Sequence, residues 1–425
     1  MVWSGRWQRA RGQATGLFTG RIPRGTLPRS REGLIPGNGS ATNPRKTALM
    51  GDHAENTVKV GLIGWRGMVG SVLMERMRVC GDFKQLKPTF FSTSDVGGQG
   101  PTVDGTTHTL ENAHDIDALR ELPVIISCQG GDYTKAVYPK LRAAGFKGYW
   151  IDAASALRMQ DDAVLLLDPV NRQVIEEGLN RGIKTFCGAN CTVSLMLMAL
   201  QGLFQAGLVE WLSSMTYQAA SGAGAAQMRE LVGQMAVIAS GAGPVLQDPA
   251  SSALDVDAAV ARQLGTDGFP KSALGAPLAA SLIPWIDVPV AGGQTREEWK
   301  GFAETNKILG TSAPIPVDGI CVRVGSMRCH AQAFTIKLRS DVPLDEVNGL
   351  LGEANDWVRV VHNDRDSTVS QLSPAAVSGT LDIPIGRVHK LNMGPEYLGA
   401  FSVGDQLLWG AAEPLRRMLD ILKHA

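Results

Sequence analysis

The chain has 425 residues, of which 44% are hydrophobic and 19% are charged. This length is long for one domain and supplies enough apolar side chains for two folded cores. Lys plus Arg and Asp plus Glu both number 41, so the net charge is close to zero. That balance gives no electrostatic reason to expect a nucleic-acid or membrane partner. No apolar run approaches the roughly 18 residues that a membrane-spanning helix needs.

The cysteines indicate a compartment. They stand at positions 80, 128, 187, 191, 321 and 329, mostly within apolar, strand-like runs. In a chain of this size the pattern favours a reducing, cytoplasmic environment over a disulfide framework. A disulfide between Cys187 and Cys191 is the less favoured alternative. A zinc site from these two residues with Cys329 and His330 is disfavoured, because the spacings match no usual ligand pattern.

The first fifty residues differ from the rest of the chain. They carry nine Lys or Arg residues and one acid, Glu32, with Gly and Pro scattered throughout. Such a segment cannot bury enough apolar surface to fold, so we expect residues 1–56 to be disordered. It lacks the apolar centre of a secretory signal and weakly resembles an organelle transit peptide. The abrupt change in composition favours another explanation, in which Met50 is the true start.

A nucleotide-binding unit is predicted at the start of the first domain. Residues 58–63 are a β-branched run typical of a strand, followed by the turn Gly64-Trp65-Arg66-Gly67-Met68-Val69-Gly70 and by helical periodicity. Strand, glycine turn and helix are the parts of a dinucleotide site, in which N–H groups at the helix start hold a pyrophosphate. The spacing is G-x-x-G-x-x-G rather than G-x-G-x-x-G, so the motif alone also fits an ordinary strand-to-helix turn.

The second predicted strand, residues 88–94, indicates the cofactor. An NAD site usually has an Asp or Glu at this strand's end, whereas this strand ends in three hydroxyl residues. Because Arg66 in the glycine turn could also contact a 2′-phosphate, the sequence favours NADP. A third strand, residues 123–128, runs into a polar loop that begins at Gln129, where an open α/β sheet binds its ligand.

Two more buried strands are predicted at residues 149–152 and 164–167. Arg158 lies between them, among small residues, and is either a surface cation or an anion-binding side chain.

The turn Gly188-Ala189-Asn190-Cys191-Thr192 precedes an apolar helical run. Asn190 is a good N-cap, because its side-chain oxygen can accept an unpaired N–H of the first turn. Cys191 then occupies the first helical position, where the helix dipole favours a thiolate. On local sequence a nucleophile and a buried structural cysteine are equally consistent with this pattern.

The second half of the chain mixes strands and helices. A strand at residues 213–220 contains Gln218, which either faces solvent or positions a ligand, and a flexible turn beginning at Ser221 follows. Residues 228–261 are expected to be helical with a break at 241–244. Residues 281–287 contain a proline and are expected at a sheet edge or in a loop. A helix with a Thr cap begins at Thr295.

Three further features of this half carry polar candidates. Glu297 and Lys300 share a helix face, and an ordinary solvated ion pair is the favoured interpretation of them. Strands are expected at residues 320–324 and 327–334, and the second contains His330. This histidine, unlike the others, interrupts a strand of the second domain, where a buried hydrogen-bonded role and a catalytic one are equally consistent. A long amphipathic helix, residues 404–418, is expected to pack on the first domain.

Several of these motifs together resemble aspartate-β-semialdehyde dehydrogenase of the Gram-negative bacterial type. They are Gly64–Gly70, Phe91–Ser94, Cys128–Gly131, Gly188–Thr192, Glu297–Lys300 and Arg328–His330. The resemblance extends from about Val58 to the C-terminus and does not cover residues 1–56. It departs from the family at Ala189 and Ala223, both small enough to preserve the backbone path.

The resemblance implies an α/β fold in which a Rossmann-type NADP domain is joined to an α+β catalytic and dimerisation domain. We expect the first domain to comprise residues 57–189 with 394–425, and the second residues 190–393. The resemblance also implies a cytoplasmic homodimer.

The resemblance assigns roles to individual residues. Cys191 would be the nucleophile, His330 the general acid/base, and Gln218 would orient the substrate, with Asn190 as helix cap and wall of the oxyanion pocket. Arg323 would bind the substrate carboxylate, Glu297 its ammonium group, and Arg158 and Lys300 its phosphate. The NADP site would comprise Gly64, Arg66, Gly67, Met68, Val69, Thr93, Ser94, Gln129, Ser221, Gly222, Pro249 and Gln406.

The implied reaction is the NADPH-dependent reductive dephosphorylation of L-aspartyl 4-phosphate to aspartate 4-semialdehyde through a cysteine thioester. The product is a precursor of lysine, methionine and threonine. A reductase for N-acetylglutamyl phosphate is one alternative, although Glu297 suits a free ammonium group better than an acetamide. A non-catalytic nucleotide-binding protein is the alternative from another class.

Overall fold

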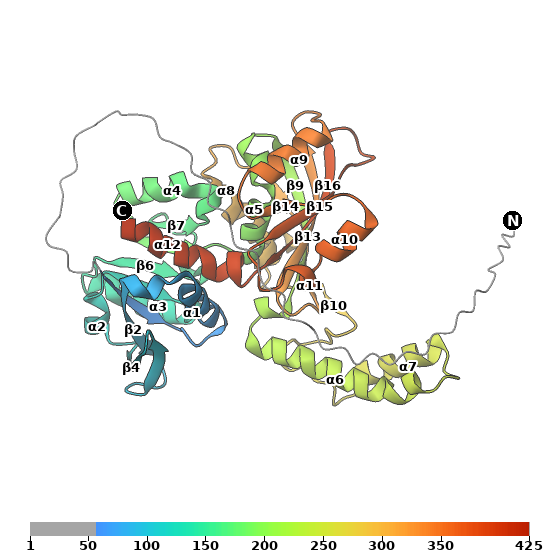
Figure 1. Ribbon diagram of the computed structural model, residues 1–425, viewed down its shortest axis with the longest axis horizontal. Helices are drawn as coiled ribbons and strands as arrows, with labels where there is room; N and C mark the ends of the chain where they lie inside the picture. The colour runs from blue at the N-terminus through green and yellow to red at the C-terminus, as the bar shows by residue number, and fades with distance from the viewer. Residues whose placement is uncertain (1–56, 425) are drawn as a thin grey trace. The chain divides into compact units, whose positions relative to one another are not determined.

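The computed structural model describes residues 57–424. The expectations of a disordered N-terminal segment and a start at Met50 lie outside these residues. The described chain forms two eight-stranded sheets with helices packed on them (Figure 1). Within this range, no helix combines the length and the apolar character that a bilayer crossing requires.

The first sheet has the order β3-β4-β2-β1-β5-β6-β8-β7, and its neighbours are parallel except for β3 and β4. All five strands predicted in this half are confirmed, with bounds that differ by at most two residues. The strands are β1 (Val58–Ile63), β2 (Leu86–Ser92), β3 (Gln99–Val103), β4 (Thr106–Asn112), β5 (Val124–Ser127), β6 (Tyr149–Asp152), β7 (Ala163–Leu166) and β8 (Thr185–Gly188).

Helices cover both faces of this sheet. Successive strand residues point to opposite faces, and here both faces carry apolar side chains that have to be buried. Val60 and Leu62 belong to one core cluster, with α1 (Met68–Cys80), α4 (Asp168–Asn180) and α12 (Glu413–His424). Ile63 and Ile125 belong to the other, with α3 (Gly131–Ala143); α2 (Ile116–Arg120) also lies there. The expected Rossmann-type domain is thus confirmed.

The second sheet has the order β10-β12-β9-β13-β16-β15-β14, with β11 paired to β9. It is mixed, because β9 is parallel to β12 and antiparallel to β13. The proline-containing run at 281–287 does lie at an edge, as β10. The strands are β9 (Val209–Gln218), β10 (Leu282–Ile283), β11 (Val317–Asp318), β12 (Cys321–Val324), β13 (Cys329–Leu338), β14 (Val358–Val360), β15 (Ile383–Lys390) and β16 (Tyr397–Asp405).

The helices of this half are α5 (Cys191–Gln205), α6 (Ala225–Gln247), α7 (Ala253–Leu264), α8 (Arg296–Leu309), α9 (Leu344–Glu353), α10 (Arg365–Gln371) and α11 (Pro374–Val377). The helix break expected at residues 241–244 is wrong. Helix α6 continues through Pro244, and the chain turns at residues 248–252 instead. Because Pro244 lies in the last turn of α6, its missing N–H removes only one hydrogen bond near the helix end.

The helix expected to begin at Gly404 is also wrong in its start. Residues 397–405 form β16, which is hydrogen-bonded between β13 and β15. A π-helix at Leu408–Ala412 follows, and α12 begins only at Glu413. The chain therefore leaves the second sheet after Asp405, later than the expected domain boundary at residue 394. Helix α12 does pack on the first sheet, as expected.

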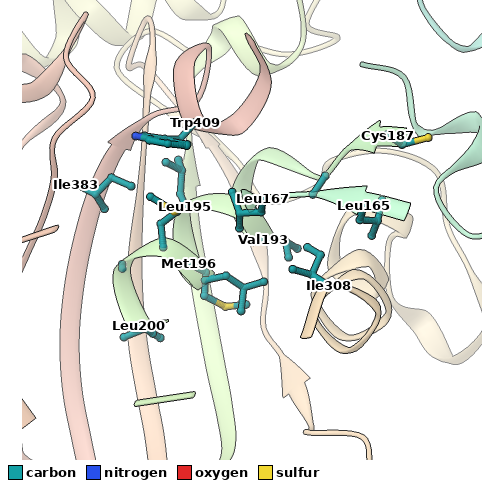
Figure 2. Close-up of a cluster of buried hydrophobic side chains, with 14 of the residues drawn as sticks. Leu165, Leu167, Cys187, Val193, Leu195, Met196, Leu200, Ile308, Ile383 and Trp409 are labelled. Carbon is teal, nitrogen blue, oxygen red and sulfur yellow. The ribbon is translucent and has the colours of Figure 1, made fainter. Parts of the chain in front are cut away.

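Helix α5 is buried along its length and belongs to a core that contains strands of both sheets. Every residue from Thr192 to Leu203 is buried, which accounts for its apolar sequence on all sides. Figure 2 shows Val193 and Met196 of α5 among side chains that include Leu165 of β7, Ile308 of α8 and Ile383 of β15. This packing fixes the position of the helix N-terminus, where Cys191 lies.

The packing of α12 can be tested with Met418→Ala. Met418 is fully buried against the first sheet, so truncation should lower the free energy of unfolding by about 2–5 kcal/mol. Leu254→Ala, at a side chain that is 78% exposed, is the control and should change it by no more than about 0.5 kcal/mol. Chemical denaturation followed by tryptophan fluorescence measures both. Equal effects would contradict the assignment of α12 to the core.

Candidate active site

Cys191 and His330 come together where α5 meets the second sheet. The Sγ atom of Cys191 lies 3.3 Å from Nε2 of His330. His330 is fully buried on β13, a central strand with partners on both sides. The two residues are far apart in sequence, and the long-range packing of α5 on this sheet brings them into contact.

The backbone determines which nitrogen of His330 carries the proton. The N–H of Ala219 donates to Nδ1 at 3.0 Å, so Nδ1 must be unprotonated. In the neutral ring the proton is therefore on Nε2, facing the sulfur. Burial, and after it the nearby Arg323 charge, lowers the pKa of His330 to about 3. At neutral pH the ring is an uncharged hydrogen-bond donor toward Cys191.

Asn190 caps α5, as predicted, and binds to α8 as well. Its Oδ1 accepts hydrogen bonds from the N–H groups of Thr192 at 3.0 Å and Val193 at 3.2 Å. Its Nδ2 donates to Glu297 at 2.9 Å, and its backbone N–H donates to Glu304 at 2.6 Å. Three polar groups of one residue thus join the N-terminus of α5 to α8. The proposed contribution of Asn190 to an oxyanion pocket stays a prediction.

Glu297 and Lys300 do form an ion pair, at 3.0 Å, but it is not solvated. Glu297 is 7% exposed and Lys300 is 9% exposed, so the favoured interpretation of an ordinary surface pair is wrong. Gln218, at the end of β9, donates to the same carboxylate at 3.3 Å. Lys300 also donates to Asp287 at 3.0 Å. Burying an ion pair is costly unless both charged groups also have other polar partners. Here both have one, since Glu297 also accepts from Gln218 and Lys300 also donates to Asp287.

The two arginine candidates have different hydrogen-bond partners near Cys191. Arg158 is buried and donates through Nη1 to Glu304 at 3.0 Å, which excludes the surface-cation alternative. Its Nε is also buried and has no partner among the described residues. Arg323, on β12, donates through Nη1 to the carbonyl of Ala219 at 2.8 Å. Both guanidinium groups act on Cys191, since each lowers the pKa of its thiol.

The ionisation of Cys191 differs from the expectation. The helix dipole was expected to favour a thiolate, yet burial and, after it, the Glu297 carboxylate raise the thiol pKa to about 12. The cations of Arg158, Arg323 and Lys300 oppose this rise without cancelling it. Desolvation penalises the charged form more strongly than the helix terminus stabilises it. In this arrangement the sulfur is a thiol at neutral pH.

A cavity of about 290 Å³ lies at the carboxyl ends of β1, β2 and β5. Six of the twelve predicted cofactor residues line it. Gly64 has φ +73°, and a Cβ there would lie 2.5 Å from the backbone of Cys128, so this position requires glycine. Gly67 caps α1 without a side-chain hydrogen bond, which leaves N–H groups of the first turn for a phosphate. The lining includes Gly64, Arg66, Gly67, Thr93, Ser94 and Gln129.

This cavity contains the side chains that were predicted to contact the 2′-phosphate of NADP. Nη2 of Arg66 lies 3.4 Å from Oγ of Ser92, and the guanidinium is half exposed at the end of β2. A half-exposed guanidinium beside hydroxyl groups suits a 2′-phosphate, and Asp95 lies 3.6 Å from Nη1 of the same side chain. Met68 and Val69 begin α1 directly after this turn.

Ser221, Gly222 and Gln406 lie near Cys191 rather than in that cavity. Nε2 of Gln406 donates to Oγ of Ser221 at 2.8 Å. A Cβ on Gly222 would lie 2.9 Å from Arg323 and 3.0 Å from the His330 ring, so this turn packs directly on the catalytic candidates. Pro249 is exposed in the turn between α6 and α7 and does not line the cavity.

The six cysteines, all within residues 57–424, are free thiols. In the same part of the chain, no group of three or more His, Cys, Asp or Glu side chains is placed to hold a metal ion.

Sequence reasoning missed Glu304, Asp287 and Gly410. Glu304 lies seven residues after Glu297 on α8, and this spacing, which puts both on one face, could have identified it. Asp287 pairs with Lys300 and has an unusual φ of +74°, which the sequence does not reveal. Gly410 belongs to the π-helix, and a Cβ there would lie 2.7 Å from that of Cys191. Such helices recur at functional sites.

The charge environment of Cys191 can be tested with Glu297→Gln in a Cys80→Ser background, which removes the exposed thiol. Because the carboxylate raises the thiol pKa, its loss should lower that pKa and increase the thiolate fraction. The iodoacetamide alkylation rate of Cys191 at pH 8 should rise by about threefold or more. Glu298→Gln, on the same helix, is the control. An unchanged or slower rate in Glu297→Gln would refute this electrostatic account.

Comparison with known proteins identifies the family. Residues 59–178 match the family model for the semialdehyde dehydrogenase NAD binding domain, and residues 200–409 match that for its dimerisation domain. The chain is 48% identical to aspartate semialdehyde dehydrogenase from Francisella tularensis, covering 86% of this chain and 100% of that one, with a TM-score of 0.82.

Two more distant structures share the fold. One is aspartate semialdehyde dehydrogenase II from Vibrio cholerae complexed with ASA, at 24% identity, 87% and 98% coverage and a TM-score of 0.71. The other is aspartate semialdehyde dehydrogenase with NADP from Candida albicans, at 17% identity, 86% and 98% coverage and a TM-score of 0.58. From its two family-model matches and the Francisella relative, the chain belongs to the aspartate semialdehyde dehydrogenase family.

Proposed function

We propose that this chain catalyses the NADPH-dependent reductive dephosphorylation of L-aspartyl 4-phosphate to L-aspartate 4-semialdehyde. The observation that carries the proposal is the contact between Cys191 and His330 inside a buried set of charged side chains. Buried charges are costly, and a site that gathers two acids and three cations around one thiol matches a ligand with several charges. The acids are Glu297 and Glu304, and the cations are Arg158, Lys300 and Arg323.

The substrate carries three charged groups, and each has a candidate partner. The family resemblance assigns Arg323 to the α-carboxylate, and its guanidinium lies beside the His330 ring at the Gly222 turn. Glu297 is assigned to the ammonium group, which would replace Lys300 as the cation beside that carboxylate. Lys300 and Arg158 are then available for the phosphate. Gln218, already in contact with Glu297, would orient the substrate next to the sulfur.

The first covalent step is attack of the Cys191 sulfur on the acyl carbon. A carbon–sulfur bond forms, the carbon–oxygen bond to phosphate breaks, and phosphate leaves with that electron pair and the thiol proton. The ammonium group of the substrate favours this step, because it neutralises the Glu297 charge that raises the thiol pKa. The backbone N–H of Cys191, which the Asn190 side chain does not cap, would stabilise the oxyanion.

The second step reduces the thioester. When bound, NADPH supplies the hydride that converts the thioester carbonyl into a thiohemiacetal. The thiohemiacetal then collapses to the aldehyde, the carbon–sulfur bond breaks, and the sulfur regains a proton from solvent. His330 presents its Nε2–H to the sulfur throughout, so it stabilises the negative charge of the departing thiolate. Of the acid and base roles expected for this residue, the geometry supports the donor role.

The cofactor in this proposal is held at two places. The glycine turn and Arg66 would hold the pyrophosphate and the 2′-phosphate, while Ser221, Gly222 and Gln406 would border the nicotinamide near Cys191. The aldehyde product would serve as a precursor of lysine, methionine and threonine. The six free thiols support a reducing, cytoplasmic location.

The assembly proposed for the enzyme is a homodimer. The family model that covers residues 200–409 is described as a dimerisation domain. Met215 and Tyr217 on β9, a central strand of the second sheet, are large apolar side chains that are 39% and 38% exposed. Exposed apolar side chains on a sheet face are typical of a surface that a partner covers.

The proposed reaction is tested in the direction that forms NADPH from NADP and aspartate semialdehyde. Wild type should depend on added phosphate and should be far slower with the N-acetylglutamate semialdehyde. Cys191→Ala should lose at least about a thousandfold in turnover, because the nucleophile is gone, while its NADP affinity stays within about twofold. Cys80→Ser is the control and should retain full activity. Retained turnover in Cys191→Ala, or turnover independent of phosphate, would exclude the mechanism.

A further inference from the structure

Glu304 joins two parts of the site that the sequence holds far apart. It projects from α8 and is only 1% exposed. Its Oε1 accepts a hydrogen bond from Nη1 of Arg158 at 3.0 Å, and its Oε2 accepts one from the backbone N–H of Asn190 at 2.6 Å. One buried carboxylate therefore binds both an arginine after β6 and the turn that carries Cys191.

This contact determines which edge of the Arg158 guanidinium is free. Nη1 is bound to Glu304, and Nη2 donates to the carbonyl of Ala153 at 3.3 Å. Nε is buried and has no partner among residues 57–424. A guanidinium presents five N–H donors in a rigid plane, so fixing Nη1 also fixes the direction of Nε. A buried, unpartnered donor on a held cation is a binding group for an anion.

The placement on α8 makes Glu304 part of a continuous face. Glu297, Lys300 and Glu304 are separated by three and four residues, so they project from the same side of the helix. Glu297 contacts the Asn190 side chain, whereas Glu304 contacts its backbone and Arg158. This face of α8 thus extends from the turn that carries Cys191 to Arg158. Arg158 and Lys300 are the two residues predicted to bind the phosphate.

We propose that Glu304 is a positioning residue, which holds Arg158 so that its free edge binds the phosphate group displaced by Cys191. This inference rests on the proposed function, because it concerns the phosphate of that reaction. Glu304 touches neither the sulfur nor the substrate in this account. It acts by holding Arg158. Because it also binds the backbone of Asn190, it fixes the position of Arg158 relative to Cys191.

Two physical effects predict opposite results, so the proposal can be tested sharply. If Glu304 acted only through its negative charge, Glu304→Gln would strengthen phosphate binding, because an anion near the site would be removed. If it positions Arg158, the same variant weakens phosphate binding. Arg158 and Asn190 donate to different oxygens of the carboxylate, and in an amide one of these two positions is a donor.

The experiment measures the KM for phosphate in wild type and Glu304→Gln at saturating NADP and aspartate semialdehyde. We expect this KM to rise by about tenfold or more, as for loss of a hydrogen bond to a charged group, while the KM for the semialdehyde changes by less than about twofold. Glu298→Gln is the matched control. It removes a carboxylate of the capping box on the same helix, so it should lower the melting temperature and leave the phosphate KM unchanged.

A binding measurement separates this inference from the proposed reaction. Inorganic phosphate should protect Cys191 from iodoacetamide, and half-protection should need about tenfold more phosphate in Glu304→Gln than in wild type. This readout needs no turnover, whereas a wild type without phosphate-dependent NADPH formation would refute the reaction itself. If Glu304→Gln fails to fold, Glu304→Asp keeps the charge but shortens the reach, and it should also raise the half-protecting concentration. An unchanged or lower phosphate requirement in a folded variant overturns the proposal.

Discussion

The site depends on how the N-terminus of α5 is held in a buried position. A helix start has unpaired N–H groups, and burying them without partners would be costly. Asn190 solves this locally, since its side chain accepts from two N–H groups of the first turn. The same residue binds α8 through Glu297 and Glu304. Because these bonds converge on one residue, the position of Cys191 is coupled to α8 as well as to α5.

The charges around the thiol follow from that coupling. Helix α8 brings two carboxylates into a buried region, and each is paired with a cation, Lys300 for Glu297 and Arg158 for Glu304. Removing one partner of such a pair would leave an uncompensated buried charge, which accounts for the complete pairing. The balance still disfavours a thiolate at Cys191. A substrate whose ammonium group neutralises Glu297 would shift that balance, so binding and activation of the sulfur are linked.

Local sequence predicted the parts of this arrangement that local physics determines. The strands of the first sheet follow from short β-branched runs, and the caps at Asn190 and Thr295 follow from their side chains. The resemblance to a known family supplied Arg323 and settled on one role each for His330 and Gln218, which the residues alone had left open, and the proximity of the three in the fold is consistent with it. What composition and spacing could not give was the burial of the Glu297–Lys300 pair, because burial depends on the long-range packing of α8.

Most of the incorrect or missing predictions also concern contacts between residues that are distant in the sequence. Helical periodicity placed a helix at Gly404, yet β16 is stabilised by hydrogen bonds to strands on both sides, which periodicity does not record. The bond from Ala219 to Nδ1 of His330 also joins distant residues, and it selects the ring tautomer. Of the missed residues, Glu304 was the easiest to predict, because its spacing from Glu297 on a capped helix is visible in the sequence.

The central claim is that Cys191 carries the acyl group between the two chemical steps. The most direct measurement mixes the enzyme with aspartate semialdehyde and NADP in the absence of phosphate, quenches with acid and maps adducts by peptide mass spectrometry. The account predicts an aspartyl thioester on Cys191, formed with a burst of NADPH and removed when phosphate is added before the quench. An adduct on another residue, or a burst of NADPH with Cys191 unmodified, would contradict it.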